Sequence, residues 1–165
     1  MNKKTDLSPA IINFFRHQNF VIVSTLDAEK NIHCSAKGIA GVEKEGKIYL
    51  IDLYFAQTFE NLRRDPTISL TSVDEHIFTG YTLKGKAEII EREKIAAHIV
   101  KSWEEKVVQR VSTRVIKNIR KDQQGKHHPE ARFPHPKYLI VATIEEVVDL
   151  TPAHLKKPLK DTEKG

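Results

Sequence analysis

Short runs of β-branched and aromatic residues recur along the chain, separated by polar turns such as residues 27–31 and 43–46. Runs of this length and composition predict β-strands, and short polar turns between them predict antiparallel hairpins. The predicted strands cover residues 20–26, 32–39, 47–53, 68–73, 78–90 and 138–148. Gly80 and Gly85, inside the fifth run, indicate a bulge, a bend or a close backbone approach. Short strands joined in this way favour a small antiparallel barrel.

Three other stretches have the pattern of helices. The first begins at Pro9 and ends at Asn19, and a short second helix over residues 58–64 stops before Pro66. A long helix over 93–120 carries an apolar side chain at every fourth position. These apolar residues are Ile95, Ile99, Trp103, Val107, Val111, Val115 and Ile119. The predicted fold class is therefore mainly β (α+β), an antiparallel β-barrel with flanking helices.

The 165 residues and 18.9 kDa correspond to one globular domain. No apolar run approaches the roughly 20 residues of a membrane helix, and the N-terminal residues lack the apolar stretch of a signal peptide. The single cysteine, Cys34, excludes an internal disulfide. We expect one domain over residues 1–150, a basic flexible tail over 151–165, no membrane association and a cytoplasmic location.

The net charge of +5 lies entirely in the second part of the chain, because residues 1–92 hold 12 basic and 12 acidic side chains. Residues 93–137 hold 11 Lys and Arg against 5 Asp and Glu. Such a segment indicates either a solvated helix face or an anionic partner, such as nucleic acid or a phosphate-bearing cofactor. Few aromatic residues are available there for base stacking, and Trp103 belongs to the apolar positions.

Several common kinds of catalytic site are not predicted. The histidines at 127, 128 and 135 lie in a proline-rich stretch without the spacing of metal ligands, and no metal site is expected. Cys34 lies on a predicted strand with no paired base in the sequence around it. The chain lacks the Gly-x-Ser-x-Gly elbow, the Gly-x-Gly-x-x-Gly fingerprint and the phosphate-binding Gly-Lys-Ser/Thr loop. No catalytic residue is assigned.

A phosphate site is one interpretation of residues 57–64, which follow a strand and open a short helix. Backbone N–H groups and the positive end of the dipole at a helix start favour anions. Thr58 would add a hydroxyl, and Gln57 and Asn61 would add amides. The alternative is that Thr58 only caps the helix.

Lys37 lies in the middle of a predicted strand, among the small residues of Cys34-Ser35-Ala36-Lys37-Gly38. Small residues allow a planar ligand to lie against the backbone, and a lysine there can meet an anion or a ring carbonyl. The alternative is an outward-facing lysine on an antiparallel sheet.

In their order, these segments resemble the FMN-binding split β-barrel of the pyridoxamine 5′-phosphate oxidase-like superfamily. The most specific motifs are Asn61-Leu62-x-x-Asp65-Pro66 and the Gly85-Lys86-Ala87 strand. The resembling order is strand Asn19–Leu26, strand Ile32–Gly38, strand Ile48–Leu53, Gln57-Thr58-x-x-Asn61-Leu62-x-x-Asp65-Pro66, strand Ile68–Ser72 and Gly80-Tyr81-x-x-x-Gly85-Lys86-Ala87. The resemblance covers about residues 8–150.

The resemblance implies a homodimer with FMN in a groove between two split barrels. The ring would lie against the second and third strands, the phosphate would lie after the third strand, and the partner chain would contribute from the fifth. The implied residues are Ser35, Ala36, Lys37, Asp52 and Leu53 for the ring, Gln57, Thr58 and Asn61 for the phosphate, and Gly80 and Tyr81 from the partner.

The chain departs from the true oxidase in three respects. Gln57-Thr58 stands where the oxidase has an Arg-Lys pair at the phosphate, the C-terminal substrate segment with arginine and tryptophan is missing, and the long helix is not an oxidase feature. The expected function is therefore FMN binding, with flavin-dependent hydride or electron transfer to an unknown small molecule rather than vitamin B6 oxidation. The alternatives are nucleic-acid binding through residues 93–137, or a split barrel that binds deazaflavin or haem.

Overall fold

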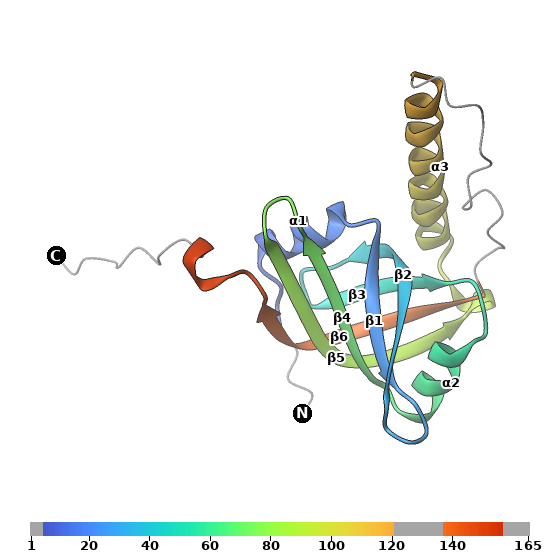
Figure 1. Cartoon of the computed structure of the whole chain (residues 1–165). Coiled ribbons are helices and arrows are strands. Elements are labelled where there is room, and N and C mark those ends of the chain that lie inside the picture. Colours follow the sequence, from blue (N-terminus) through green and yellow to red (C-terminus); the bar gives the residue numbers. More distant parts are fainter. Residues whose placement is uncertain (1–4, 121–136, 157–165) are drawn as a thin grey trace.

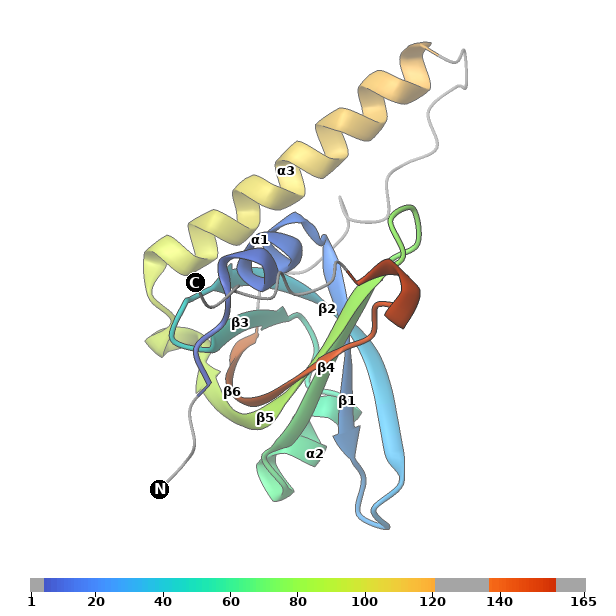
Figure 2. The same ribbon diagram turned by 90° about the vertical axis from the view of Figure 1, so that its left-hand side faces the viewer.

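Six antiparallel strands close into a barrel in the order β1-β2-β3-β6-β5-β4 (Figures 1 and 2). The computed structural model describes residues 5–120 and 137–156. The strands are β1 (Phe20–Leu26), β2 (Ile32–Val42), β3 (Lys47–Asp52), β4 (Thr67–Asp74), β5 (Thr79–Glu91) and β6 (Tyr138–Asp149). The helices are α1 (Pro9–His17), α2 (Gln57–Arg64) and α3 (Ala97–Arg120), with 3₁₀ turns at Arg92–Lys94 and Ala153–Leu155. The predicted mainly β fold, a split barrel with flanking helices, is confirmed.

The barrel closes through the last strand of the sequence. β6 pairs along its length with β5 and, on its other edge, with β3, while β1 and β4 pair on the opposite side of the barrel. The remaining pairs join strands that follow one another in the chain, as hairpin signals predict.

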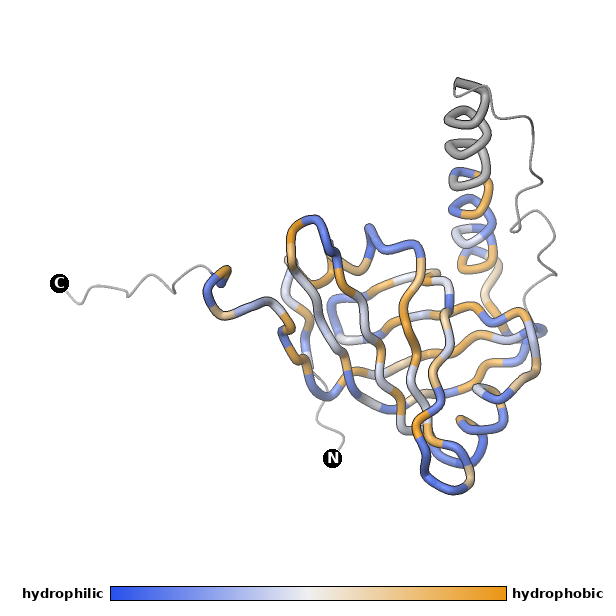
Figure 3. Tube along the Cα trace, in the orientation of Figure 1, coloured by the Kyte–Doolittle hydropathy of each residue, from blue (hydrophilic) through white to orange (hydrophobic). Residues whose placement is uncertain are grey.

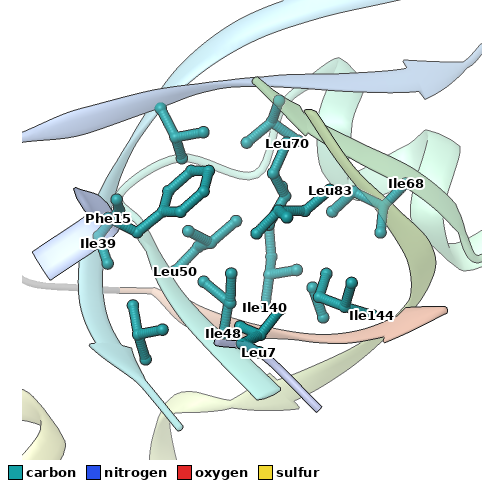
Figure 4. Packing of buried hydrophobic residues seen from close by; sticks show 14 of the residues in the cluster. Leu7, Phe15, Ile39, Ile48, Leu50, Ile68, Leu70, Leu83, Ile140 and Ile144 are labelled. Atoms are coloured by element: carbon teal, nitrogen blue, oxygen red, sulfur yellow. The ribbon is translucent and has the colours of Figure 1, made fainter. Parts of the chain in front are cut away.

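Buried residues alternate with less buried ones along β1 and β4, as the two-residue period of a strand requires. Hydrophobic and hydrophilic positions are interspersed along the strands of the barrel (Figure 3). In β1 the inward positions Val21 and Val23 are buried, whereas Phe20 and Ile22 are exposed. Phe15 of α1 and Leu7 add to the strand residues at the centre of this core (Figure 4). Other members are Ile39, Ile48, Leu50, Ile68, Leu70, Leu83, Ile140 and Ile144.

The backbones of β5 and β6 approach closely at Gly85, which is one of the features that a glycine inside a predicted strand indicated. The register between β5 and β6 shifts between Lys84 and Gly85. A Cβ atom at Gly85 would lie 1.9 Å from the backbone oxygen of Thr143. Only glycine fits there without displacing the partner strand.

α3 runs across the outside of the barrel and extends beyond it (Figures 1 and 2). Trp103 is buried against Ala40, Ile51, Leu139 and Val141, which form a second apolar cluster on the outer face of the barrel. The predicted helix over 93–120 is confirmed, except that a 3₁₀ turn occupies its first residues.

Parts of the sequence predictions concern residues that lie outside those described. These are the loop histidines at 127, 128 and 135 and the tail beyond residue 156. Among the described residues, no helix combines the length and apolarity needed to cross a membrane.

Candidate functional site

A groove of about 270 Å³ lies on the outer face of β1, β2 and β3, under α3. Ala36, Gly38 and Ile51 form its floor. Its remaining lining residues are Asn19, Phe20, Lys37, Asp52, Leu53, Tyr54 and Trp103. Four of the five residues predicted to contact a flavin ring therefore come together in one place, and Ser35 is the exception.

The floor is flat because small residues face outward on β2. Ala36 is paired with Ile22 of β1, and Gly38 is paired with Phe20. Residues paired across two strands share a face of the sheet, and Phe20 and Ile22 are both on the exposed face. Phe20 and Trp103 supply aromatic walls beside this floor.

Lys37 faces the other way from its neighbours. It is paired with the buried Val21, and its Nζ lies 2.5 Å from Oδ2 of Asp52. The side chains of Lys37 and Asp52 are 11% and 3% exposed. The alternative of an outward, solvated lysine is therefore wrong, and the ammonium is held by a carboxylate.

Asp52 is the centre of a buried polar cluster on three adjacent strands. Its Oδ2 also accepts a hydrogen bond from the hydroxyl of Tyr138, the residue opposite it on β6. Its Oδ1 accepts from the backbone N–H groups of Leu53, at 2.8 Å, and Tyr54, at 3.4 Å. Every oxygen of this carboxylate thus has partners, as a buried charge requires.

Tyr138 is enclosed by aromatic rings at the end of β3. Phe55 stacks on it with ring centroids 5.6 Å apart, and Phe59 of α2 lies 4.9 Å away. Burial, followed by the hydrogen bond to Asp52, raises the pKa of the Tyr138 phenol. The phenol therefore stays protonated and remains a donor to the carboxylate at neutral pH.

The predicted phosphate residues lie at the start of α2, and the side chains of all three have hydrogen-bond partners within the protein. The Thr58 hydroxyl lies 2.9 Å from the hydroxyl of Ser35, and Thr58 is 2% exposed. Asn61 is fully buried and donates to the hydroxyl of Thr25, while its Oδ1 accepts from Gln57 and Arg64. These bonds fasten α2 to the barrel, and Gln57 is the one of the three that is exposed.

Gly80 and Tyr81 do not line the groove of their own chain. Tyr81 lies beside α1, with its ring centroid 5.1 Å from that of Phe14. The backbone oxygen of Gly80 accepts from the N–H of Leu150. Their predicted contribution across a dimer stays a prediction.

A second, larger cavity of about 610 Å³ lies between the end of α1, the β2–β3 hairpin and α3. Tyr49 on its floor donates a hydrogen bond to Glu43, and burial together with this carboxylate raises the pKa of Tyr49 to about 12. Apart from Tyr49 and Glu43, its polar lining is Arg16, His98, Ser102 and Lys106. None of the predicted site residues lines this cavity, so the smaller groove is the candidate site.

Sequence reasoning did not assign Asn19, Phe20, Trp103 or Tyr138 to the site. Trp103 was identified only as one member of an apolar helix face, and Tyr138 only as the start of a strand. The sequence did offer one signal for Tyr138: the polar Asp52 ends an apolar strand, and a buried carboxylate needs hydrogen-bond donors. The positions of Tyr138 and Trp103 in the site depended on the pairing of β6 with β3 and on where α3 crosses the barrel.

The six-stranded barrel and its helices place the protein in the class of split β-barrels of the pyridoxamine 5′-phosphate oxidase-like superfamily. A sequence profile described as pyridoxamine 5′-phosphate oxidase matches residues 7–150. Because this match spans most of the chain, the protein belongs to the pyridoxamine 5′-phosphate oxidase family.

Solved structures from bacteria share the fold. HupZ of Group A Streptococcus is similar with a TM-score of 0.60 and 16% identity, over 88% of this chain and 95% of that one. A candidate pyridoxamine 5′-phosphate oxidase from Lactobacillus delbrueckii gives 0.59 and 19%, over 87% and 93%. HutZ, the haem storage protein of Vibrio cholerae, gives 0.50 and 14%, over 87% and 94%. The chain has no match among proteins of curated function.

Proposed function

We propose that the protein binds FMN in the groove beneath α3 and acts as a flavin-dependent oxidoreductase on a small molecule. The observation that carries the proposal is the flat floor of Ala36 and Gly38 between the aromatic walls of Phe20 and Trp103. A planar ring fits against such a floor, and the groove volume is near the lower end of the roughly 300 to 1,000 Å³ of small-molecule sites. When bound, the flavin would supply hydride or electron transfer.

Residues at the start of α2 would bind the phosphate. The first turn of this helix leaves backbone N–H groups without intrahelical acceptors, and it follows directly from Leu53 and Tyr54 of the groove. Gln57 is exposed there. Thr58 and Asn61 would act by fixing the helix to the barrel, because their side chains are engaged with Ser35 and Thr25.

The Lys37–Asp52 pair would support the ring without adding net charge. A lysine without a compensating carboxylate would favour an anionic reduced flavin. Since Asp52 compensates Lys37 at 2.5 Å, we propose that the pair sets the position of the β2–β3 floor. No described side chain is assigned as an acid or base for the reaction.

A second copy of the chain would complete the site. Members of the family commonly form dimers. Phe20, Ile22 and Ile32 are 58%, 40% and 74% exposed on the neighbouring face of β1 and β2. Apolar side chains of this size side by side on a sheet indicate a protein contact. We therefore propose a homodimer in which this face is covered and the groove lies at its edge.

Haem is the second candidate ligand, because HutZ shares the fold. The ten residues that line the groove include no histidine, cysteine or methionine, the common axial ligands of haem iron. Tyr54 is the one lining residue of a type that ligates haem iron. The groove therefore supports a flavin better than haem.

Titration of the dialysed protein with FMN and, separately, with haemin tests the proposal. Wild-type protein should bind FMN with a shifted flavin absorption band. Ala36→Phe should weaken binding at least tenfold, because Ala36 is exposed on the groove floor and the larger ring fills it. Lys86→Phe is the control, since Lys86 is exposed on β5, outside the groove and outside the β1–β2 face that the dimer would cover.

Two results would overturn the proposal. The first is a failure of wild-type protein to bind FMN even at a large excess of FMN, whether or not the separate titration with haemin gives a Soret band. The other is equal FMN affinity in Ala36→Phe and wild type, which would place the ligand elsewhere. Sedimentation of the FMN-loaded protein as a monomer would refute the dimer.

A further inference from the structure

Trp103 is the sole tryptophan of the chain, and it is buried in a way that leaves its polar edge without a partner. It is 8% exposed. Its ring packs in the outer apolar cluster with Ala40, Ile51, Leu139 and Val141. A buried indole N–H usually finds a hydrogen-bond acceptor. Within residues 5–120 and 137–156, no acceptor is within hydrogen-bonding geometry of Trp103 Nε1.

This N–H faces the groove rather than the protein interior. Nε1 is the Trp103 atom nearest to the position that a Cβ of Gly38 would take, at 3.4 Å, with Cδ1 at 3.7 Å. Gly38 is on the groove floor and Trp103 is a groove wall. No fully enclosed nitrogen or oxygen of the described side chains lacks a partner, so Nε1 is accessible, and the groove is the space that its ring lines.

The rest of α3 holds the ring in this position. The register of β2 and β3 shifts between Ile39 and Gly41, so that Ala40 is an extra residue in the ladder. The Ser102 hydroxyl donates to the Ala40 oxygen at 3.4 Å, and the Lys106 ammonium donates to the Ile39 oxygen at 3.1 Å. Trp103 therefore lies between two helix residues, Ser102 and Lys106, whose side chains bind the β2 backbone at this β-bulge.

We propose that the Trp103 indole N–H donates a hydrogen bond to an acceptor atom at the edge of the planar ligand in the groove. An indole N–H is only a donor, so its partner is a carbonyl oxygen or an unprotonated ring nitrogen. This makes Trp103 a positioning residue that selects rings carrying such acceptors at the edge. The inference rests on the proposed function for the existence of the ligand, and it assigns α3 a part in recognition.

The experiment uses FMN with full-length protein. In wild type, the single indole N–H resonance should move on addition of FMN, because it changes from a solvent-exposed to a ligand-bound donor. Trp103→Phe keeps an aromatic wall and removes the donor. It should weaken FMN binding about fivefold to tenfold by calorimetry, the effect expected for one hydrogen bond.

Val107→Ala is the matched control, because Val107 packs against the same cluster from α3 without lining the groove. FMN affinity in this variant should stay within about twofold of wild type. Far-ultraviolet circular dichroism and the urea midpoint establish that each variant is folded.

The possible failures are distinguishable. If wild type binds FMN but the indole resonance does not move and Trp103→Phe keeps wild-type affinity, the role of Trp103 is refuted while the proposed function stands. If Val107→Ala weakens binding as much as Trp103→Phe, the effect belongs to helix packing and the hydrogen bond is refuted. If wild type does not bind FMN, the proposed function itself fails.

Discussion

Lys37 of β2 and Asp52 of β3 form an ion pair inside the barrel wall, with Nζ 2.5 Å from Oδ2 and both side chains almost completely buried. The pair lies beside the Gly38–Ile51 position of the β2–β3 ladder, where Gly38 and Ile51 face the groove. Lys37 and Asp52 also line the groove, so the buried pair adjoins the groove floor. A substitution of Lys37 or Asp52 should therefore shift the strands that form the groove floor.

Asp52→Asn should destabilise the protein strongly, because it leaves the buried ammonium of Lys37 without a counter-charge. Loss of one partner of a buried pair costs about 3 kcal/mol or more. The surface pair of Lys84 and Glu146 is the control, since its side chains are 49% and 58% exposed. Glu146→Gln should cost less than about 1 kcal/mol. Urea unfolding measures both, and similar losses in the two variants would contradict a special role for the buried pair.

Tyr138→Phe should change how stability depends on alkaline pH. Burial and the hydrogen bond to Asp52 raise the pKa of Tyr138 above its ordinary value of 10.0. A raised pKa in the folded state means that the stabilisation is complete below pH 10 and is lost as the pH rises toward the folded-state pKa. Urea unfolding of wild type should therefore show a fall in stability above about pH 10 that is smaller in Tyr138→Phe. Parallel pH profiles would contradict this.

Asp65→Asn should act at the opposite end of the pH scale. Asp65 follows α2, and hydrogen bonds from Lys30 and then from Thr67 hold its pKa well below the ordinary 3.8. A lowered pKa means that the stabilisation is present above pH 3.8 and is lost as the pH falls toward the folded-state pKa. The stability gap between wild type and Asp65→Asn should be full at pH 7 and should narrow below about pH 4. A gap that is constant with pH would show that the carboxylate charge is not the cause.

Gly85→Ala should unfold or severely destabilise the barrel, by at least about 3 kcal/mol. The added Cβ would lie 1.9 Å from the Thr143 backbone oxygen, so β5 and β6 would have to separate. Gly38→Ala is the contrasting variant, because the nearest atom to its Cβ is Trp103 Nε1 at 3.4 Å, an ordinary contact. It should cost less than about 1 kcal/mol by urea unfolding. Equal tolerance of the two substitutions would contradict the close approach of β5 and β6.

The strands and helices were largely predictable from the sequence, because they depend on local patterns. β1 was predicted at its observed bounds, and the other strands and α2 within three residues at either end. The glycine at position 85 marked the close approach before the partner strand was known. Hairpin turns also indicated the pairs β1–β2, β2–β3 and β4–β5, since these strands follow one another along the chain.

The candidate site was predicted in part. The small residues on β2 identified one side of the groove and the start of α2 identified the neighbouring helix, whereas Asp52 and Leu53 were implied by the resemblance to the oxidase-like superfamily. The orientation of Lys37 depended on the register with β1, which pairs it with Val21. The partners of Thr58 and Asn61 depended on where α2 docks, because Ser35 and Thr25 are more than 20 residues away.

The sequence by itself thus determined which segments are strands and helices, because each residue's preference is a local property. Only the tertiary structure decided that β6 inserts between β3 and β5, which brings Tyr138 to Asp52, and that α3 lies over β2, which brings Trp103 to Gly38. Both contacts join residues more than 60 positions apart. Such contacts form because closing the barrel and covering its outer apolar cluster remove apolar surface from water, and no local pattern specifies which partner will do so.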